Sequence, residues 1–419
     1  EVIAARPLST AELVLGKYLG AVSALGGLSL LVLLLTLAIQ AAKISFLGTP
    51  FSLKPYAAYL LLMTLPALIY MSSLTFFLGA ILRRQTAVSL LIITYTLAVL
   101  FFLGERYGGI YDFGAFFAPL FYSDMIGLGD IGRIIQQRLF YLALSVAFLG
   151  LAVGRYPRLP QSARWTWTSR GCALGGLLAA TGLYVHMESQ DEAQAAYRQN
   201  LLSIQQEHAT YPVPQVRHYD LKVSLLASNP LEATAALHLH NPHALALDTL
   251  VFTLNPGLKI SGLSRGDTAL SWQRRGSVVR VPLPLASGDS TVLAFAYAGD
   301  IDRQGFDLRR DGTRLKKSKW PFIKGDLTAW IRAESIFLPS RSRWYPNAGV
   351  DYGGDIDGND PQPSFSTADI ALTLPAGLET VTQGVPTQTS AEGVRHTQHW
   401  RVDDPVIALS LNAGPFEIF

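Results

Sequence analysis

Histidine and carboxylate side chains are the groups in this sequence that could bind a metal or move a proton. His238 and His240 are two residues apart, with His243 shortly after them. On a β-strand that spacing puts the two imidazoles on one face, and imidazole suits several transition metals. A solvent-facing strand surface has the same pattern, and we favour this interpretation over a metal site.

No complete catalytic motif is present in the sequence. A zinc peptidase of the His-Glu-x-x-His type needs two histidines on one zinc ion and a glutamate that activates water, and no such string occurs. There is also no phosphate-binding Gly-x-x-x-x-Gly-Lys-Ser/Thr loop, so ATP hydrolysis would have to come from a partner. The acidic run 355–360 resembles a calcium loop but lacks the Gly and Glu of an EF-hand, which favours a solvated loop. We therefore predict no catalytic, cofactor-binding or metal-binding residue in this chain.

The charges divide the 419 residues into two unlike parts. Residues 1–187 hold 13 basic and 6 acidic residues (+7), the rest hold 21 and 25 (−4), and the two sum to +3. The front part is thus poor in charge and suited to membrane lipid, while the rear part is suited to water. The small net charge argues against a nucleic-acid partner. Cys172 is the only cysteine, so no intrachain disulfide is possible.

Five apolar segments in the front part are predicted to cross a membrane, since a spanning helix needs roughly 20 apolar residues. Pro66 lies inside the second segment and predicts a kink there. Arg138 precedes the fourth, and we expect its side chain to reach the membrane interface. The five segments are 18–39, 56–82, 86–103, 139–153 and 171–186.

Arginines in the short loops predict the orientation of these segments. The loops after the second and fourth segments are rich in arginine, which places them and the N-terminus in the cytoplasm and everything after His186 outside. The aromatic, Gly-rich loop 104–138 is predicted to form a re-entrant or interfacial hairpin, either as a substrate gate or as an amphipathic anchor. No segment carries a charge at its centre, which argues against an ion-coupled transporter.

The first 17 residues contain a second informative pattern. Ser9 and Glu12 have the spacing of a helix capping box. The segment also resembles the one that docks on the ATPase subunit in ABC-2-type transporter permeases. The matching residues are Arg6, Pro7, Leu8, Ser9, Leu15, Gly16 and Lys17. The resemblance implies ATPase docking through Arg6, Pro7, Ser9 and Lys17; the alternative is an ordinary amphipathic helix leading into the first span.

The rear part changes from helical to alternating patterns. Residues 188–214 are predicted to be a polar helical stalk or linker that ends at Pro212 and Pro214. From 215 onward, short runs of alternating apolar residues are separated by Asn-Pro and Gly-containing turns. We therefore expect a multidomain protein: an α-helical transmembrane bundle of about five spans, followed by an all-β antiparallel sandwich or saddle.

Several strings in 215–419 resemble the N-terminal β-domain of M1-family (gluzincin) aminopeptidases. Their order along the chain also follows that family. Gln383 stands where Asn is usual before Gly384. The strings are Arg217–Val223, 240–254, Phe337–Asn347 with its Arg-Trp-Tyr-Pro, 364–377, and Gly384. Glu334 lies near the position of a substrate-binding side chain in the family, but its register does not support a transfer of that role.

Together these resemblances imply a piece of a longer bacterial inner-membrane protein. The expected domains are a cytoplasmic coupling segment (1–17), a permease region (18–187), the stalk (188–214) and a periplasmic or extracellular M1-like β-domain (215–419). The chain would be the permease segment of an ABC-type exporter, with a separate ATPase, membrane lipid and a peptide or amphiphilic substrate as partners. Zinc is expected only in a missing downstream catalytic domain. The alternatives are a membrane-anchored zinc aminopeptidase, or a non-catalytic binding or scaffold domain on a membrane anchor.

Overall fold

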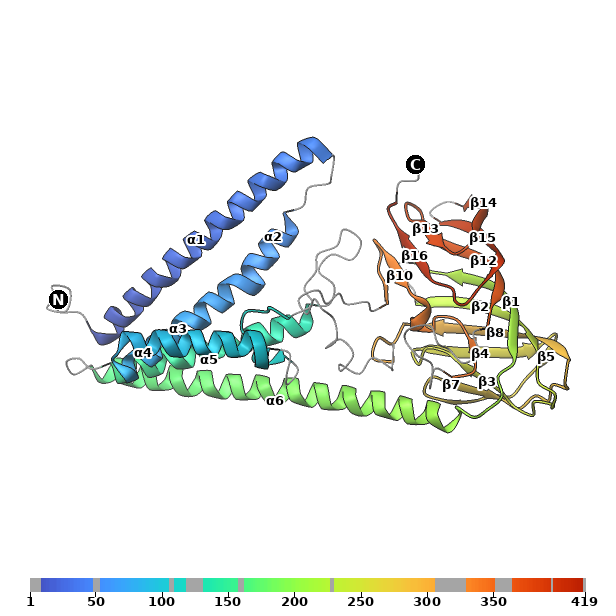
Figure 1. Ribbon diagram of the computed structural model, residues 1–419, viewed down its shortest axis with the longest axis horizontal. Helices are drawn as coiled ribbons and strands as arrows, with labels where there is room; N and C mark the ends of the chain where they lie inside the picture. Colours follow the sequence, from blue (N-terminus) through green and yellow to red (C-terminus); the bar gives the residue numbers. More distant parts are fainter. Residues whose placement is uncertain are drawn as a thin grey trace. The chain divides into compact units, whose positions relative to one another are not determined.

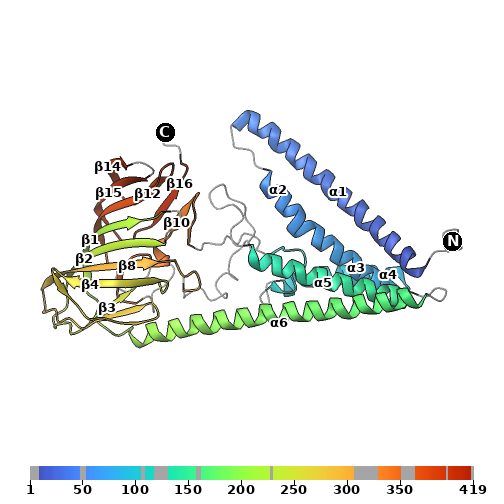
Figure 2. The same cartoon turned by 180° about the vertical axis from the view of Figure 1, so that it is seen from behind.

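The computed structural model divides into two compact units, one up to Glu192 and one from Ala193 onward (Figure 1). The first unit is helical and the second consists mainly of strands (Figure 2). The structure describes residues 9–47, 53–104, 109–117, 131–156, 162–226, 230–305, 329–350, 364–392 and 395–416.

Within the described residues of the first unit, four helical runs are long and apolar enough to cross a membrane: Thr10–Ala42, Lys54–Leu82, Gln85–Leu103 and Gly132–Arg155. They correspond to the first four predicted spans. The fifth predicted span falls within a longer helix whose small residues make it less apolar, and it does not join these four. The helices are α1 (Thr10–Leu47), α2 (Lys54–Ala58), η1 (Tyr59–Thr64), α3 (Leu65–Leu82), α4 (Gln85–Ala98), η2 (Val99–Leu103), α5 (Gly132–Arg155) and α6 (Ala163–Glu207).

The second helical run widens just before its proline. The segment η1 is π-helical, and Pro66 lies at the start of α3 immediately after it. Proline has no N–H to donate and its ring clashes with the preceding turn, so the backbone must change its hydrogen-bond pattern nearby. Where the sequence predicted a kink, the structure has a π-helical turn followed by regular α-helix.

Small residues bring α5 and α6 into close contact. A Cβ atom on Gly150 would lie 2.6 Å from the carbonyl oxygen of Ser169 and 2.7 Å from the backbone nitrogen of Ala173. A Cβ atom on Gly176 would lie 2.6 Å from the backbone nitrogen of Ala147. Glycine, alanine and serine at helix crossings allow this approach and are typical of helix packing in membranes. The two helices thus pack backbone to backbone.

The strands that the structure describes in the second unit form three sheets. The largest has the strand order β14-β15-β12-β1-β2-β8-β4-β5, and the two smaller ones have the orders β13-β16-β10-β9 and β11-β3-β7-β6. The strands are β1 (Gln215–Ser224), β2 (Leu231–His240), β3 (Leu250–Thr253), β4 (Leu258–Arg265), β5 (Thr268–Ala269), β6 (Gln273–Arg275), β7 (Val278–Val281), β8 (Ser290–Gly299), β9 (Trp330–Ile331), β10 (Ile336–Leu338), β11 (Asn347–Ala348), β12 (Ser366–Pro375), β13 (Glu379–Thr382), β14 (Val385–Glu392), β15 (Arg395–Val406) and β16 (Leu411–Gly414). A short 3₁₀ turn, η5, covers Ser340–Ser342.

One strand pair corrects the predicted antiparallel architecture. β1 pairs with β12 in parallel, whereas the other ladders among the described strands are antiparallel. A parallel pair needs a long crossover connection, and here about 140 residues separate the two strands. Alternation along each strand was visible in the sequence, but strand direction depends on this distant pairing. The large sheet is therefore mixed.

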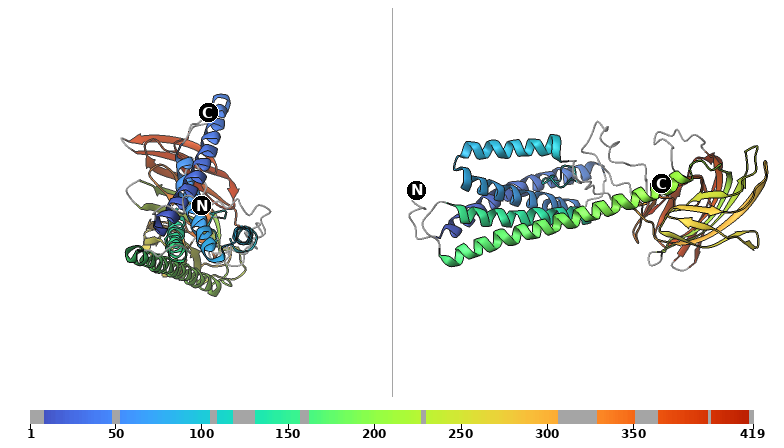
Figure 3. Two further views of the ribbon diagram at one scale, coloured as in Figure 1. Left: turned by 90° about the vertical axis from the view of Figure 1, so that its left-hand side faces the viewer. Right: turned by 90° about the horizontal axis from the view of Figure 1, so that it is seen from below.

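Alternating side chains of the large sheet form the core with the two smaller sheets. Figure 3 shows the strands of the second unit from two further directions. Leu221 of β1, Leu237 of β2 and Ile370 of β12 are buried on the inner face. Phe252 of β3 stacks edge-on against Phe295 of β8, with ring centroids 5.2 Å apart. On β1 and β12 the outer face carries polar residues such as Lys222 and Asp369, as expected for a sheet with one solvated side.

The end of α6 belongs to this second core. Ile204 forms a buried cluster with Val251 of β3 and Val278 of β7. Leu201 is also buried, at 1% exposure. One of its methyl groups lies so close to Gly276 that a Cβ atom added to this glycine would be 2.6 Å from it. These contacts cover the outer side of the small sheet that contains β3 and β7. The last turns of α6 are therefore packed, although their sequence is largely polar.

Candidate functional site

The predicted docking residues lie at and before the start of α1. The Ser9 hydroxyl and backbone N–H both donate to the Glu12 carboxylate at 2.8 Å, and the Glu12 N–H donates back to Ser9 Oγ at 3.2 Å. The capping box predicted from this spacing is thus present. Lys17 is exposed on α1. Arg6 and Pro7 lie outside the described residues.

The first turns of α1 are tied to other helices of the same unit. Ala11 and Val14 are buried, at 1% and 2% exposure, and form a cluster with Val153 near the end of α5. Trp165 of α6 packs against this cluster. The start of α1 therefore packs against both α5 and α6.

We predicted that the Arg138 side chain reaches the membrane interface, but it is buried within the protein. Its side chain is only 3% exposed and donates to the carbonyl oxygens of Phe113, at 2.5 Å, and Asp112, at 2.8 Å. It also donates to the side-chain oxygen of Gln137 at 2.8 Å. A buried guanidinium is tolerated only when such acceptors replace its water. The sequence could not show this, because the carbonyls come from a loop some 25 residues earlier.

These bonds hold a compact turn over 109–117 against α5. The Asp112 carboxylate accepts the N–H groups of Phe116 and Phe117, each at 2.8 Å. Gln137 donates to the carbonyl oxygen of Gly109 at 2.5 Å, and Tyr141 donates to that of Ile110. The predicted hairpin over 104–138 is described only in part, since 105–108 and 118–130 lie outside the described residues. Its described portion consists of the packed turn 109–117 and the first residues of α5.

The Arg-Trp-Tyr-Pro string is part of the core of the second unit. Trp344 and Tyr345 are buried, at 0% and 1% exposure. The Trp344 ring N–H donates to the Leu409 carbonyl oxygen at 3.3 Å, and the Tyr345 hydroxyl accepts the Leu409 N–H at 2.9 Å. Burial raises the pKa of the Tyr345 hydroxyl. These two side chains therefore join the loop to the segment before β16, which is a structural role.

Gly384 stands where no other residue fits well. Its φ is +89°, and an added Cβ would lie 2.2 Å from the carbonyl oxygen of Arg401. Beside it, the Gln383 side chain donates to Ser410 Oγ and accepts the Ser410 N–H, both at 2.8 Å. Gln383 thus uses both the donor and the acceptor of its amide side chain to hold Ser410. Glu334 is exposed in the turn between β9 and β10.

The three histidines singled out in the sequence do not converge. His238 and His240 share a strand face as predicted, but His240 contacts Ser290 Oγ at 3.2 Å. His243 contacts the Val213 carbonyl oxygen at 2.9 Å. The solvent-facing interpretation therefore holds for His240. The acidic run 355–360 lies outside the described residues.

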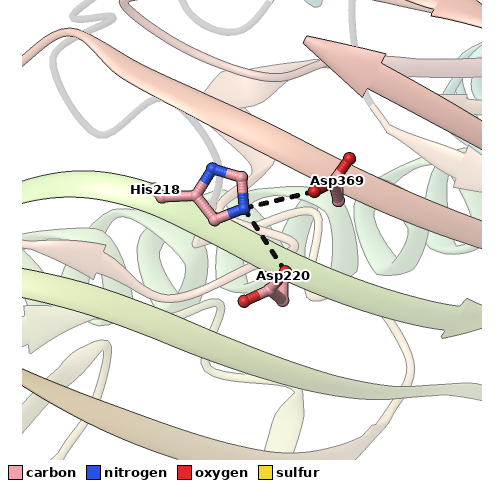
Figure 4. A group of neighbouring side chains, drawn as sticks. All are labelled: His218, Asp220 and Asp369. Atoms are coloured by element: carbon pink, nitrogen blue, oxygen red, sulfur yellow. Dashed lines mark hydrogen bonds and ion pairs between the residues drawn. The ribbon is translucent and has the colours of Figure 1, made fainter. Parts of the chain in front are cut away.

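His238 instead belongs to a group that sequence reasoning missed. Its Nε2 lies 2.8 Å from Asp220 Oδ2. His218 Nε2 lies 3.3 Å from Asp220 Oδ1 and 3.5 Å from Asp369 Oδ2 (Figure 4). The metal-ligating atoms of His218, Asp220 and Asp369 all lie within 4.8 Å of one another. We call these four residues the outer-face cluster.

Strand register explains how the outer-face cluster assembles. His218 and Asp220 are two residues apart on β1, so they share a face. His238 of β2 is the partner of His218, and Asp369 of β12 is the partner of Asp220. The His218-x-Asp220 spacing was readable in the sequence. The parallel partner that brings Asp369 to them was not.

Comparison with known proteins gives partial structural likenesses only. No family model matches the sequence, and no curated protein matches it. Among solved structures, the M1 zinc metallopeptidase of Deinococcus radiodurans is 20% identical, with a TM-score of 0.38 over 50% of this chain and 44% of that one. Aminopeptidase A of Legionella pneumophila, in complex with aspartic acid, is 12% identical, with a TM-score of 0.36 over 51% of this chain and 22% of that one. This chain thus spans less than half the length of either protein.

Proposed function

We propose that this chain is the permease segment of an ABC-type exporter, anchored in a bacterial inner membrane and carrying an M1-like β-domain outside. The coupling segment would be 1–17, the permease region 18–187, the stalk 188–214 and the β-domain 215–419. A separate ATPase would supply the energy, and an amphiphilic or peptide substrate would be moved. The β-domain would bind rather than hydrolyse, since the sequence contains no His-Glu-x-x-His string.

Four apolar helices support the membrane part of this proposal. Each is long enough to cross a bilayer, and apolar side chains such as Leu28, at 59% exposure, face away from the rest of the protein. In water such a surface would be costly, whereas lipid covers it without penalty. The backbone contact of α5 with α6 supports a fifth crossing by α6, because helices in lipid associate through such small residues.

The capped start of α1 is the observation that carries the transport proposal. Ser9 and Glu12 fix where the helix begins, and Ala11 and Val14 attach that beginning to Val153 of α5. An ATPase subunit that grips the residues just before Ser9 could therefore move α1 and α5 together. Arg6 and Lys17 would provide positive charges for an acidic surface on that subunit.

The experiment is to purify the full chain from its native membranes and measure the ATP hydrolysis that copurifies. We expect Arg6→Glu to lower this activity at least tenfold, because the charge reversal replaces attraction with repulsion. Lys54→Glu, at the start of α2, is the matched control and should retain it. Equal activity in the wild type and both variants would refute the docking role. Absence of copurifying hydrolysis from the wild-type chain would refute the transport proposal.

A further inference from the structure

The outer-face cluster contains two carboxylates that face each other across a strand pair. Asp220 and Asp369 are register partners in the parallel pair β1–β12. Like charges directly opposite each other on a sheet are destabilising. The Arg401 guanidinium contacts Asp369 Oδ1 at 3.2 Å and offsets part of this charge. Asp369 Oδ2 and Asp220 Oδ1 remain directed at one atom, His218 Nε2.

The other ring nitrogen of His218 has a partner that suits a metal ligand. Thr367 Oγ1 donates to the Arg217 carbonyl oxygen at 3.2 Å and lies 2.7 Å from His218 Nδ1. An Nδ1–H that donates to this hydroxyl leaves Nε2 of a neutral imidazole to bind a metal ion. Metal-binding histidines are commonly oriented by a hydrogen bond of this kind at the ring nitrogen that does not touch the ion.

Two of the three separations in the group suit a transition-metal ion in this position. Zinc binds histidine nitrogen and carboxylate oxygen at about 2.0–2.2 Å, so ligand atoms around a tetrahedral ion are separated by about 3.3–3.5 Å. The two separations from His218 Nε2 are 3.3 Å to Asp220 Oδ1 and 3.5 Å to Asp369 Oδ2. Mixed imidazole and carboxylate ligands favour zinc-like ions over calcium or magnesium.

His238 is not one of the three ligands, but it contacts one of them, Asp220. Its Nε2 contacts Asp220 Oδ2 at 2.8 Å, the oxygen that does not face His218. Outer partners of this kind hold a ligating carboxylate in place and are worth about 10–100-fold in metal affinity. The side chains are 27% exposed at His218 and 45–49% exposed at the two aspartates, so an ion can reach the group from solvent.

We propose that His218, Asp220 and Asp369 bind one divalent zinc-type ion on the outer face of the large sheet, with His238 orienting Asp220. Water would occupy the remaining coordination position. The ion would join β1 to β12, which are brought together from distant parts of the chain. It would therefore stabilise the second unit, because the unfolded chain does not hold these ligands together.

The test uses the full chain in detergent, purified without a polyhistidine tag and stripped of metal with a chelator. Zinc binding is measured by competition with a chromophoric chelator, and the thermal midpoint is recorded with and without zinc. We expect one zinc ion per chain and a higher midpoint with zinc. His218→Ala and Asp369→Asn should weaken binding at least tenfold. His240→Ala, on the same face of β2, is the matched control and should bind as the wild type does.

The metal-free thermal midpoints show whether the variants fold. All three substitutions are on the solvated face, so we expect little change in the metal-free state. No zinc binding by the wild type would overturn the proposal and leave the group as histidine–aspartate ion pairs. Equal binding by the wild type, His218→Ala and Asp369→Asn would also overturn it, since the ion would then lie elsewhere.

Discussion

Neighbouring glycines on α6 allow a sharp test of helix packing in the first unit. A Cβ atom at Gly176 would lie 2.6 Å from the Ala147 nitrogen and 2.7 Å from the Ala143 carbonyl oxygen. A Cβ atom at Gly175 would have no atom within 4 Å. We therefore predict that Gly176→Ala destabilises the bundle and that Gly175→Ala does not.

The magnitude follows from the overlap. Ordinary contact begins at 3.4 Å, so the Ala147 nitrogen must retreat by 3.4 − 2.6 = 0.8 Å and the Ala143 oxygen by 3.4 − 2.7 = 0.7 Å. Both atoms are backbone, so α5 must shift as a whole. Overpacking of this kind costs about 1–3 kcal/mol. Glycine-to-alanine replacement gains up to about 1 kcal/mol in helix propensity, and this gain applies to both variants.

The assay is unfolding of the full chain in detergent micelles by added SDS, followed by helix circular dichroism. Gly175→Ala should be neutral or slightly more stable than the wild type. Gly176→Ala should be about 1–3 kcal/mol less stable than Gly175→Ala. Equal stability of the two variants would show that α5 and α6 do not cross at this point.

Three further predictions concern the second unit. Gly384→Ala should destabilise it by about 2 kcal/mol or more, because φ is +89° and Cβ would meet the Arg401 carbonyl oxygen; thermal unfolding checks this. Leu201→Ala should lower the free energy of unfolding, measured by urea titration, by about 2–5 kcal/mol, because the side chain is 1% exposed. An unchanged urea midpoint would contradict the packing of α6 on β3 and β7. Burial raises the pKa of Tyr219 and Tyr297 above their ordinary value of 10.0, so the unfolded chain ionises first. Their contribution to stability is therefore present below pH 10.0 and is lost as the pH rises above it, and tyrosinate absorbance should appear together with unfolding.

Local patterns predicted much of the fold. Runs of about 20 apolar residues indicated the four membrane-length helices, and alternation such as Leu221 and Val223 indicated the strands. The Ser9–Glu12 spacing predicted a capping box that is present. These features depend on residues that are close together in the sequence, so they can be predicted from a single sequence. The roles assigned to Arg6, Pro7, Ser9 and Lys17 concern another protein and remain predictions.

Features that depend on distant residues were not predicted. The parallel pairing of β1 with β12 made the large sheet mixed, and it also placed Asp369 beside His218 and Asp220. The burial of Arg138 depends on carbonyl oxygens from the turn that contains Asp112 and Phe113. In each case the contact joins residues that are far apart in the sequence, and no local pattern indicates which residues the fold brings together.

Membrane topology is the most direct test of a lipid-embedded front part that carries a hydrated β-domain outside. With Cys172→Ser as background, single cysteines are placed at Ser162, just before α6, and at Asp267, between β4 and β5; both positions are exposed. Spheroplasts are then treated with a membrane-impermeant maleimide. We predict that Asp267→Cys is labelled in intact spheroplasts and that Ser162→Cys is labelled only after permeabilisation. Labelling of both positions from the same side would contradict the account.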